Sequence, residues 1–295
     1  MNPPESVRIV DVSPRDGLQN EQRPVSTATK IGLVERLQDA GLRWIEAASF
    51  VSPRWVPQMA DGPAVMRGVR RAPGVRFAAL VPNLRGLETA LDAPREAWPD
   101  DIVVFGSASE TFSRKNINCS IAESIARFAP VAVAARAQGL RVRAAMSCTV
   151  GCPFEGDVAP EAVGRLAAML RDIGVQEVAV ADTIGVGTPD TVRRALEAAL
   201  AHFPAEDVSG HFHDTHGRAL ANTEASLALG IRQFDTSAAG LGGCPYAPGA
   251  TGNVATEAVV DLLHARGFAT GIDPARLREA GRFIRDALRQ DPQAA

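Results

Sequence analysis

The chain lacks several features that would assign it to a class at once. It has only four cysteines in 295 residues and no disulfide-scaffold pattern, so we expect a reduced, cytoplasmic setting. Its formal net charge is −3, which gives no reason to expect nucleic acid or a membrane surface as a partner. No apolar run reaches the ~20 residues that cross a bilayer. The first residues also lack the apolar segment of a secretory signal.

What the chain has is a regular alternation of short β-rich runs and longer runs with helical periodicity. Eight strands are predicted at Val7–Val12, Arg43–Ala47, Arg76–Val81, Asp101–Phe105, Leu140–Met146, Glu177–Ala181, Val208–His213 and Gln233–Ser237. The helices predicted after them are Thr27–Ala40, Pro63–Arg71, Leu84–Leu91, Ile121–Gln138, Pro160–Ile173, Thr188–Phe203, Arg218–Leu229 and Thr256–Arg266.

Eight β-then-α units predict an α/β fold of the (β/α)8 TIM barrel type, with a doubly wound open sheet as the alternative. We expect one catalytic domain over residues 1–295, with the barrel at about 7–266 and an extra C-terminal helix at about 274–289. Thr188-Pro189 and Asp273-Pro274 predict helix starts. Glycines just beyond a helical run predict four helix ends, at Gly41, Gly139, Gly174 and Gly230.

The most informative stretch is His211-Phe212-His213-Asp214, at the end of the seventh predicted strand. Side chains two residues apart in a strand project onto the same face. Two neutral imidazoles on one face predict a metal site, because an apolar barrel interior has little other use for them. A single buried histidine would more simply be a hydrogen-bonded core residue.

Polar residues that follow other strands supply further candidate ligands. Asp16, after the first strand, offers an anionic oxygen, and Asn253, after the eighth, offers a neutral one. Functional groups of such barrels collect at the C-terminal ends of the strands, and the first and last strands become neighbours when the barrel closes. With the histidine pair, these oxygens predict a Mg2+ or Mn2+ site, and zinc stays open. Asp16 can instead be a helix cap or a partner of Arg15.

An arginine beside a metal at a barrel mouth is a fixed cation that can stabilise an enolate or thioester oxygen. Arg15 stands at such a place, and a carboxylate-binding or structural role is the alternative. Glu46, which closes the second strand, can hold Arg15 or fix a histidine tautomer from behind. Asp182, which closes the sixth strand, can serve the same purpose.

The loop Gly240–Gly252 contains five glycines and two prolines, a composition typical of a lid that moves over a substrate. Cys244 in this loop is a candidate proton donor or acceptor, and an inert thiol in a turn is the alternative. Cys148 and Cys152 are spaced as neither a redox motif nor a zinc knuckle, so we expect buried thiols.

Long, ordered motifs carry a resemblance to a known family. They are VDVSPRDGLQNE, IEAASFVSPRWVPQMAD, VVFGSASETFSRKNINCS, GCPFEGDV, ADTIGVGTP, HFHDTHGRALANT and AGLGGCPYAPGATGN. From about Val7 to the last helix the chain resembles 3-hydroxy-3-methylglutaryl-CoA lyase. The resemblance implies a TIM barrel that uses Mg2+ or Mn2+ to cleave this acyl-CoA to acetyl-CoA and acetoacetate.

Carried over by position, the resemblance implies a set of metal ligands: Asp16, His211, His213 and Asn253. The catalytic residues that it implies are Arg15, Cys244, His211 and Glu46. It places Arg15 and Gln19 at the substrate and gives Asp182 and Glu257 a supporting role. The expected partner is a small acyl-CoA, with CoA as part of the substrate, and a homodimer or homotetramer stays open.

Two departures from the family pattern bear on the substrate. Family members usually have tyrosine at the position of Ala145 and serine at that of Ala179. Losing an aromatic ring and its hydroxyl enlarges a pocket and removes a donor, which alters discrimination. The acyl part can therefore differ from methylglutaryl, toward a longer 3-alkyl chain or toward citramalyl-CoA.

Two rival interpretations remain at this point. Condensing acyltransferases of the isopropylmalate or homocitrate synthase kind run related enolate chemistry, but they typically show RDGEQ where this chain has RDGLQN. Many of them also continue into a further domain. A non-catalytic acyl-CoA-binding relative would lack a ligand, and all four candidate ligands are present.

Overall fold

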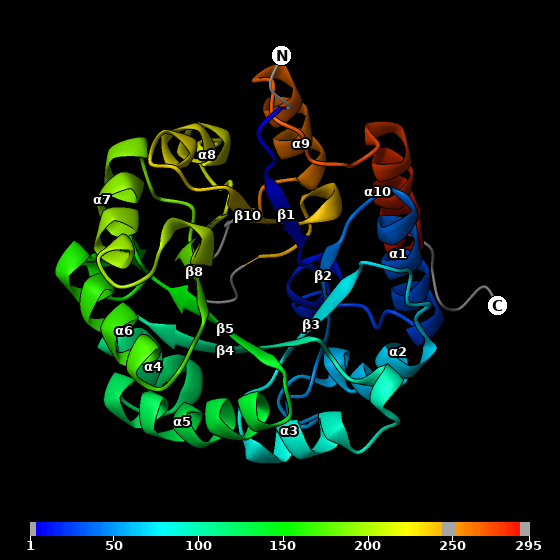
Figure 1. Cartoon of the computed structure of the whole chain (residues 1–295), viewed down its shortest axis with the longest axis horizontal. Coiled ribbons are helices and arrows are strands. Elements are labelled where there is room, and N and C mark those ends of the chain that lie inside the picture. Colours follow the sequence, from blue (N-terminus) through cyan, green and yellow to red (C-terminus); the bar gives the residue numbers. More distant parts are fainter. Residues whose placement is uncertain (1–3, 244–251, 290–295) are drawn as a thin grey trace.

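A closed barrel of parallel strands, surrounded by helices, forms the centre of the computed structural model, which describes residues 4–243 and 252–289 (Figure 1). Around the barrel the strand order is β1-β10-β9-β8-β5-β4-β3-β2. The strands are β1 (Arg8–Asp11), β2 (Trp44–Ser49), β3 (Arg76–Leu80), β4 (Asp101–Ser107), β5 (Arg141–Ser147), β8 (Glu177–Asp182), β9 (Val208–Phe212) and β10 (Gln233–Thr236). The TIM barrel prediction is confirmed, and the open-sheet alternative is wrong.

Helices follow the strands and cover the outside of the barrel. They are α1 (Thr27–Asp39), α2 (Gly62–Gly68), α3 (Leu84–Leu91), α4 (Glu110–Ile117), α5 (Ile121–Ala137), α6 (Pro160–Asp172), α7 (Pro189–Leu200), α8 (Ala219–Ala228), α9 (Thr256–Ala265) and α10 (Pro274–Arg289). Thr188 caps α7 through its side chain, as predicted. The glycines predicted to end helices all have positive φ, at Gly41, Gly139, Gly174 and Gly230.

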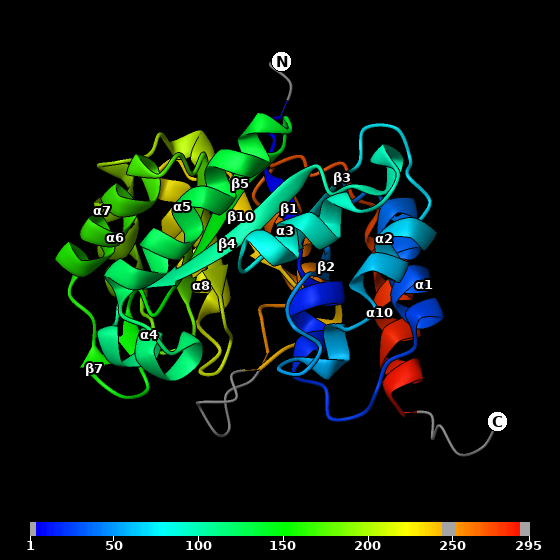
Figure 2. The ribbon, with the colours of Figure 1, turned by 90° about the horizontal axis from the view of Figure 1, so that it is seen from below.

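The sequence does not predict four of the short elements. A π-helical turn, η1 (Ser13–Gly17), follows β1, and the two-residue strands β6 (Gly151–Cys152) and β7 (Gly156–Asp157) form a hairpin after β5. The fourth is α4. The turn and the two strands are too short for a hydrophobic period to show in the sequence. The helix α4 is as long as α3, but its sequence ETFSRKNI has only two apolar residues and so shows no period. In Figure 2, α4 and β7 lie at the lower edge, where the loops after the strands gather.

The interior of the barrel is charged, which corrects the expectation of an apolar interior. In β5, Val142 and Ala144 belong to the main apolar core, whereas Arg143 between them reaches Ser209 of β9 and Asp235 of β10. Because strand side chains alternate, the apolar set packs outward against the helices and the polar set faces inward. Polar residues inside the barrel can therefore form ion pairs as well as a metal site. The assignment of the histidine pair to a metal site then depends on its geometry.

The last helix packs outside the barrel, against α1 and the turn before α9. Leu277, Ala280 and Ile284 are buried, and the Arg36 guanidinium lies 3.8 Å from the centroid of the Phe283 ring. Gly281 lies against Glu257: a Cβ there would lie 2.2 Å from Oε1, so this carboxylate would have to shift. Among the described residues, no helix has both the length and the apolarity that a membrane span requires.

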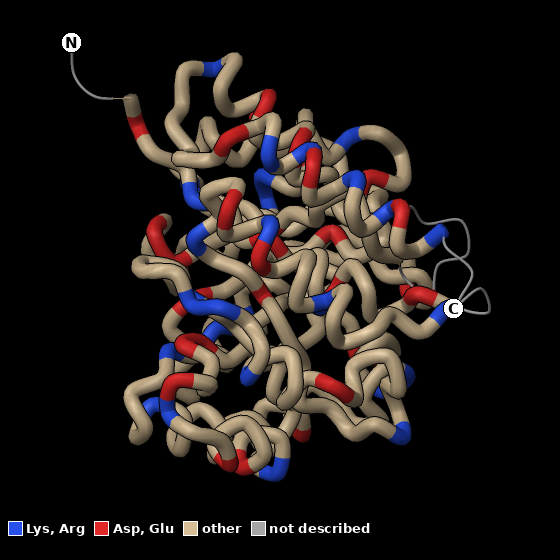
Figure 3. The backbone as a smooth tube through the Cα atoms, turned by 90° about the vertical axis from the view of Figure 1, so that its right-hand side faces the viewer, with Lys and Arg blue, Asp and Glu red and all other residues tan. Residues whose placement is uncertain are grey.

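The charged side chains and the thiols are placed as the sequence predicts: charges of both signs are mixed, and two cysteines are buried. Basic and acidic positions are interspersed on the face that Figure 3 presents. Cys148 and Cys152 are buried, as predicted. Cys152 lies 3.0 Å from the hydroxyl of Ser109, at the start of α4, so the hairpin is tied to the neighbouring loop.

Candidate metal centre

Three candidate ligands converge at the mouth of the barrel. Asp16, His211 and His213 each offer a ligand atom, and these atoms lie within 4.8 Å of one another. In residues 4–243 and 252–289 no other group of His, Cys, Asp and Glu meets this condition. The sequence places the two histidines at the end of one strand and Asp16 after another, and closing the barrel brings them together.

The histidines reach the site because they alternate along one strand. His211 lies in β9, and His213 follows its end. Their rings are stacked, with centroids 5.7 Å apart and planes at 29°. Both rings are buried, at 8% and 6% exposure. The predicted shared face is confirmed by this geometry.

Asn253 completes the cluster from the last loop. Its Nδ2 donates to Asp16 Oδ2 over 2.8 Å and to the Leu241 carbonyl over 3.1 Å. Its Oδ1 is buried and has no hydrogen-bond partner among the described residues. Because buried amide oxygens are nearly always hydrogen-bonded, this oxygen fits the role of a ligand. The backbone of His213 pairs with that of Asn253, which keeps the two side by side.

Arg15 is clamped between two carboxylates. Its Nε donates to Glu46 over 2.6 Å, and its Nη1 donates to Asp16 over 2.7 Å. Burial works against both the Arg15 and the Asp16 charge. The neighbouring carboxylates nevertheless raise the pKa of the Arg15 guanidinium, and Arg15 and the two histidines lower that of Asp16. Both groups are therefore ionised at neutral pH.

The two histidines differ in their electrostatics. Burial and the nearby His211 lower the pKa of His213 to about 4, so this ring is neutral at pH 7 and ready to bind a metal. Burial also opposes the charge on His211, but the hydrogen bond to Asp235 and the negative charges of Asp235 and Asp16 together outweigh it and raise the pKa of this ring. His211 therefore combines a ligand position with greater basicity.

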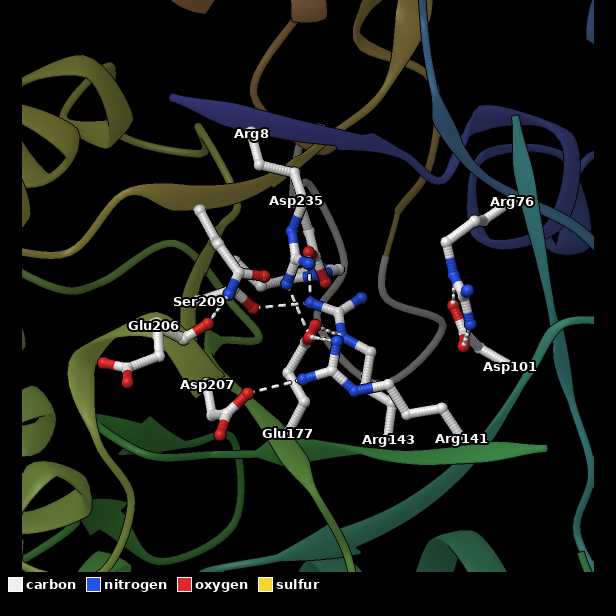
Figure 4. A network of polar contacts seen from close by, with 12 residues as sticks. Arg8, Arg76, Asp101, Arg141, Arg143, Glu177, Glu206, Asp207, Ser209 and Asp235 are labelled. Carbon is white, nitrogen blue, oxygen red and sulfur yellow. Dashed lines mark hydrogen bonds and ion pairs between the residues drawn. The ribbon is translucent and has the colours of Figure 1, made fainter. Parts of the chain in front are cut away.

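The sequence analysis missed the side chains behind His211. His211 Nδ1 lies 3.2 Å from Asp235 Oδ2, and Arg143 binds the other oxygen of Asp235 over 2.5 Å. Arg143 also pairs with Glu177 over 2.7 Å, within the interior network of Figure 4. The available signal was a charged residue at an alternating position within a predicted strand, as in RVRAAM and QFDTS.

The predicted supporting residues stabilise turns at the mouth. The Asp182 carboxylate accepts from the backbone N–H groups of Val186 at 3.1 Å and Gly187 at 2.8 Å, so it holds the turn after β8. The Glu257 carboxylate accepts from Ala239 N at 3.1 and 3.0 Å. Ala239 has a φ of 63°, so Glu257 steadies a strained turn at the start of the glycine-rich loop.

The structure gives no contact between the cluster and two further candidates, Gln19 and Cys244, and only Gln19 is among the described residues. Gln19 lies just beyond η1 and is half-buried, near enough in sequence to share the mouth with Arg15. Cys244 lies outside the described residues, as does most of the loop predicted to be a lid. The start of that loop, up to Gly243, is described. It is hydrogen-bonded to the loop after β1, because Asn20 Nδ2 donates to the Gly243 carbonyl over 2.9 Å.

A residue that no motif singled out, Asp11, braces the mouth from behind. Its carboxylate accepts hydrogen bonds from both the N–H and the hydroxyl of Ser13, which starts η1. The other oxygen accepts from Ala238 N at 3.1 Å and from the Thr256 hydroxyl at 2.7 Å, which starts α9. Burial raises the pKa of Asp11 to about 6.

Asp11 gives a testable dependence of stability on pH. Its pKa is about 6 in the folded state and 3.8 when unperturbed, so the folded state retains a proton that the unfolded chain loses first. The Asp11 contribution to the free energy of unfolding is therefore full below pH 4 and declines up to pH 6, by about 3 kcal/mol.

We expect the stability of the parent chain relative to Asp11→Asn to fall by about 2 kcal/mol between pH 4 and pH 6.5 in urea unfolding. A relative stability that stays constant over this range would contradict the assignment.

Comparisons with known proteins agree on one family. The family model described as HMGL-like matches residues 6–284. The chain is 54% identical over 284 residues to a 3-hydroxy-3-isohexenylglutaryl-CoA/hydroxy-methylglutaryl-CoA lyase of Pseudomonas aeruginosa, which covers 96% of this chain and 93% of that protein. Other relatives carry the names of mitochondrial and of cytoplasmic lyases.

Solved structures of similar proteins have the same fold. The HMG-CoA lyase of Brucella melitensis is 56% identical, with a TM-score of 0.92 over 97% of this chain and 100% of that chain. An HMG-CoA lyase of A. baumannii, in complex with coenzyme A and 3-methylmalate, is 35% identical, with a TM-score of 0.90 over 97% of this chain and 92% of that chain.

Proposed function

The chain belongs to the 3-hydroxy-3-methylglutaryl-CoA lyase family, and from that membership we propose that it cleaves 3-hydroxy-3-methylglutaryl-CoA to acetyl-CoA and acetoacetate. It is a carbon–carbon lyase. One observation supports the activity most: Asp16, His211 and His213 gather their ligand atoms within 4.8 Å, with Arg15 in hydrogen-bond contact with Asp16. The reaction needs such a combination of chelating groups and a fixed cation.

The metal that we propose for this site is Mg2+ or Mn2+. Asp16, His211, His213 and Asn253 would hold it through one carboxylate, two imidazoles and one amide oxygen. Such a mixed, oxygen-containing set suits these ions, and the orphaned Asn253 Oδ1 fits it. When bound, the ion supplies Lewis-acid binding of the substrate 3-hydroxyl and the distal carboxylate.

The residues of the chain would then divide the proton and charge transfers. Asp16 would take the proton of the substrate 3-hydroxyl, because a carboxylate keeps lone pairs beyond the one that would bind the ion. His211, with Nδ1 on Asp235 and Nε2 on the ion, would act as a ligand and has no lone pair left for this proton. The Cα–Cβ bond breaks, which leaves a ketone on acetoacetate and the enolate of acetyl-CoA.

Charge develops on the thioester oxygen as this bond breaks. Arg15 has N–H groups beyond those that bind Glu46 and Asp16, and these can donate to that oxygen. Cys244 would then give a proton to the enolate carbon. Glu46 keeps the guanidinium in place through both steps, and Gln19 would help to bind the substrate.

The direct test is a product assay on the purified chain. We expect 3-hydroxy-3-methylglutaryl-CoA with Mg2+ or Mn2+ to give acetyl-CoA and acetoacetate in equal amounts, and a chelator to stop the reaction. Release of free CoA without acetoacetate would indicate thioester hydrolysis instead. Formation of a C–C bond from acetyl-CoA and a keto acid would favour the condensing acyltransferases.

A broader substrate range is the second proposal. Ala145 and Ala179 pair in register on β5 and β8, two residues beyond Arg143 and Glu177 on the same faces of their strands. Two small side chains leave room at the inner wall of the mouth. The P. aeruginosa relative is named for both the methyl and the isohexenyl substrate. We propose that this chain also accepts a long 3-alkyl branch.

A substrate panel tests this proposal. We expect kcat/KM for a 3-isohexenylglutaryl substrate to lie within about tenfold of that for the methylglutaryl substrate, because an apolar pocket discriminates weakly against added methylenes. Ala145→Tyr should lower kcat/KM for the long substrate by about tenfold or more and change the short one less. Ala179→Ser is the matched control, since it adds only one hydroxyl. A parent chain that turns over only the methylglutaryl substrate would refute the proposal.

The remaining expectations are proposals of the same kind. We propose that the chain works as one catalytic domain with a small acyl-CoA as its partner. The A. baumannii relative in complex with coenzyme A supports the acyl-CoA part. The cytoplasmic setting and the dimeric or tetrameric alternatives stay predictions.

A further inference from the structure

The two histidines of the metal centre are supported differently. His211 Nδ1 lies 3.2 Å from Asp235, whereas His213 Nδ1 is buried and has no hydrogen-bond partner among the described residues. A ring nitrogen that donates to a carboxylate must carry the proton, so the other nitrogen is left with its lone pair. The structure therefore distinguishes one histidine with a fixed tautomer from one without such a support.

The carboxylate behind His211 is itself held in place. Asp235 Oδ1 accepts from Arg143 Nη2 at 2.5 Å, while Asp235 Oδ2 faces the ring. The same nitrogen of Arg143 binds Ser209 Oγ at 2.5 Å, and Arg143 Nε pairs with Glu177 at 2.7 Å. Figure 4 shows these side chains pointing toward one another inside the barrel.

The side chains in this network are almost completely buried. The side chains of Arg143, Glu177 and Asp235 are 6%, 5% and 3% exposed. They come from three strands, β5, β8 and β10, and they meet β9 at Ser209 and His211. A guanidinium with its donors in a rigid plane can bridge groups from several strands at once, whereas an ammonium cannot reproduce this geometry.

We propose that Asp235 and Arg143 are positioning residues that hold His211 as the Nδ1–H tautomer and aim its Nε2 at the bound divalent ion. Asp235 accepts the Nδ1 proton. Arg143, fixed by Glu177 and Ser209, keeps Asp235 ionised and stationary. The inference rests on the proposed metal role of His211, and it assigns to the charged interior of the barrel a function in the site above it.

A second ion pair lines the same cavity and supplies a control; its Arg76 side chain is 43% exposed and its Asp101 side chain 13%. Arg76 pairs with Asp101 over 2.5 Å, between β3 and β4. Both residues line the same cavity as Arg143 and Glu177. No contact in the described structure links Asp101 to a candidate ligand. A carboxylate-to-amide change at Asp101 therefore perturbs the interior without touching the support of His211.

The experiment measures Mn2+ binding to the metal-free protein by calorimetry and by the electron paramagnetic resonance signal of free Mn2+. We expect Asp235→Ala to weaken Mn2+ binding by about 10- to 100-fold, the usual effect of removing such a support. Asp235→Asn keeps an acceptor for Nδ1–H, so it should recover about tenfold of that loss. Asp101→Asn should bind Mn2+ as the parent does, even where its thermal stability falls.

Two readouts separate positioning from folding. Long-range ¹H–¹⁵N spectra of the histidine rings should show Nδ1–H for His211 in the parent and a mixed population in Asp235→Asn. If Asp235→Ala does not fold, Arg143→Lys takes its place, because lysine keeps the charge but not the bridge. We expect about tenfold weaker Mn2+ binding from it.

Unchanged Mn2+ affinity in folded Asp235 and Arg143 variants would overturn the inference, as would an equal loss in Asp101→Asn. An Nε2–H tautomer in the parent would overturn it as well. A parent chain that binds no divalent ion would instead overturn the proposed function, so the two failures are distinguishable.

Discussion

His213→Ala is expected to weaken Mn2+ binding by more than about a hundredfold, and cleavage should fall with metal occupancy. The loss of a ligand must exceed the 10- to 100-fold effect that is usual for a supporting residue. His213 is neutral at pH 7 because its pKa is lowered to about 4, so it gives up no proton to bind an ion. Among the described residues no carboxylate binds its Nδ1, so its proposed role is that of a ligand alone.

Cys244→Ala is the matched variant, because the proposed role of Cys244 concerns a proton and not the metal. We expect it to lower turnover by about a hundredfold or more, as loss of an acid or base does, while Mn2+ affinity stays near that of the parent. Calorimetry and the cleavage assay on the same preparations give both numbers. Equal loss of bound metal in the two variants would contradict this division of roles.

Arg15→Lys is the second change with a large expected effect. Lysine keeps the positive charge beside Asp16 but cannot donate to Glu46, Asp16 and the substrate in one plane. We expect kcat to fall by about 10²- to 10³-fold, the scale for losing one donor to a developing oxyanion. Mn2+ affinity should change by less than about tenfold, since Asp16 keeps a cation next to it.

Arg76→Lys is the control for this prediction, because Arg76 also pairs with a carboxylate, that of Asp101, but contacts no ligand candidate among the described residues. Its kcat should stay within about twofold of the parent value. If Arg15→Lys instead loses metal in proportion to activity, Arg15 acts on the structure of Asp16 and not on the substrate oxygen.

The histidine pair could be predicted from the sequence because its signal is local. His211 and His213 are two residues apart in a strand, and the alternation of side chains alone places both on one face. Asp16 and Asn253 needed one further step, the closure of the barrel, which brings the first and last strands together. Eight repeats of strand and helix made that closure predictable.

The residues behind the ligands could not be predicted, because their role depends on register across the barrel. Arg143 and Asp235 are 92 positions apart, and nothing local to either one says that they meet. An apolar interior, as expected from the sequence, would also leave no role for charged residues within the strands. The role of Asp11 could not be predicted for a similar reason, since its partners Ala238 and Thr256 are more than 200 positions away in the sequence.

The conformation of the turn that carries Arg15 and Asp16 could not be predicted either. The sequence shows an extended run followed by SPRDG, and it does not reveal that Ser13–Gly17 form a π-helical turn. Asp11 binds Ser13 and thereby sets the start of that turn, so its conformation depends on a contact within the fold. Local sequence can place a residue after a strand, but the direction of its side chain depends on what supports the loop.

The most direct test of the metal centre is the anomalous diffraction of Mn2+ bound to crystals of the chain. We predict one strong peak at the barrel mouth, in contact with Asp16, His211, His213 and the Oδ1 of Asn253. A peak bound elsewhere, or one that touches neither histidine, would contradict the assignment on which the proposed activity depends.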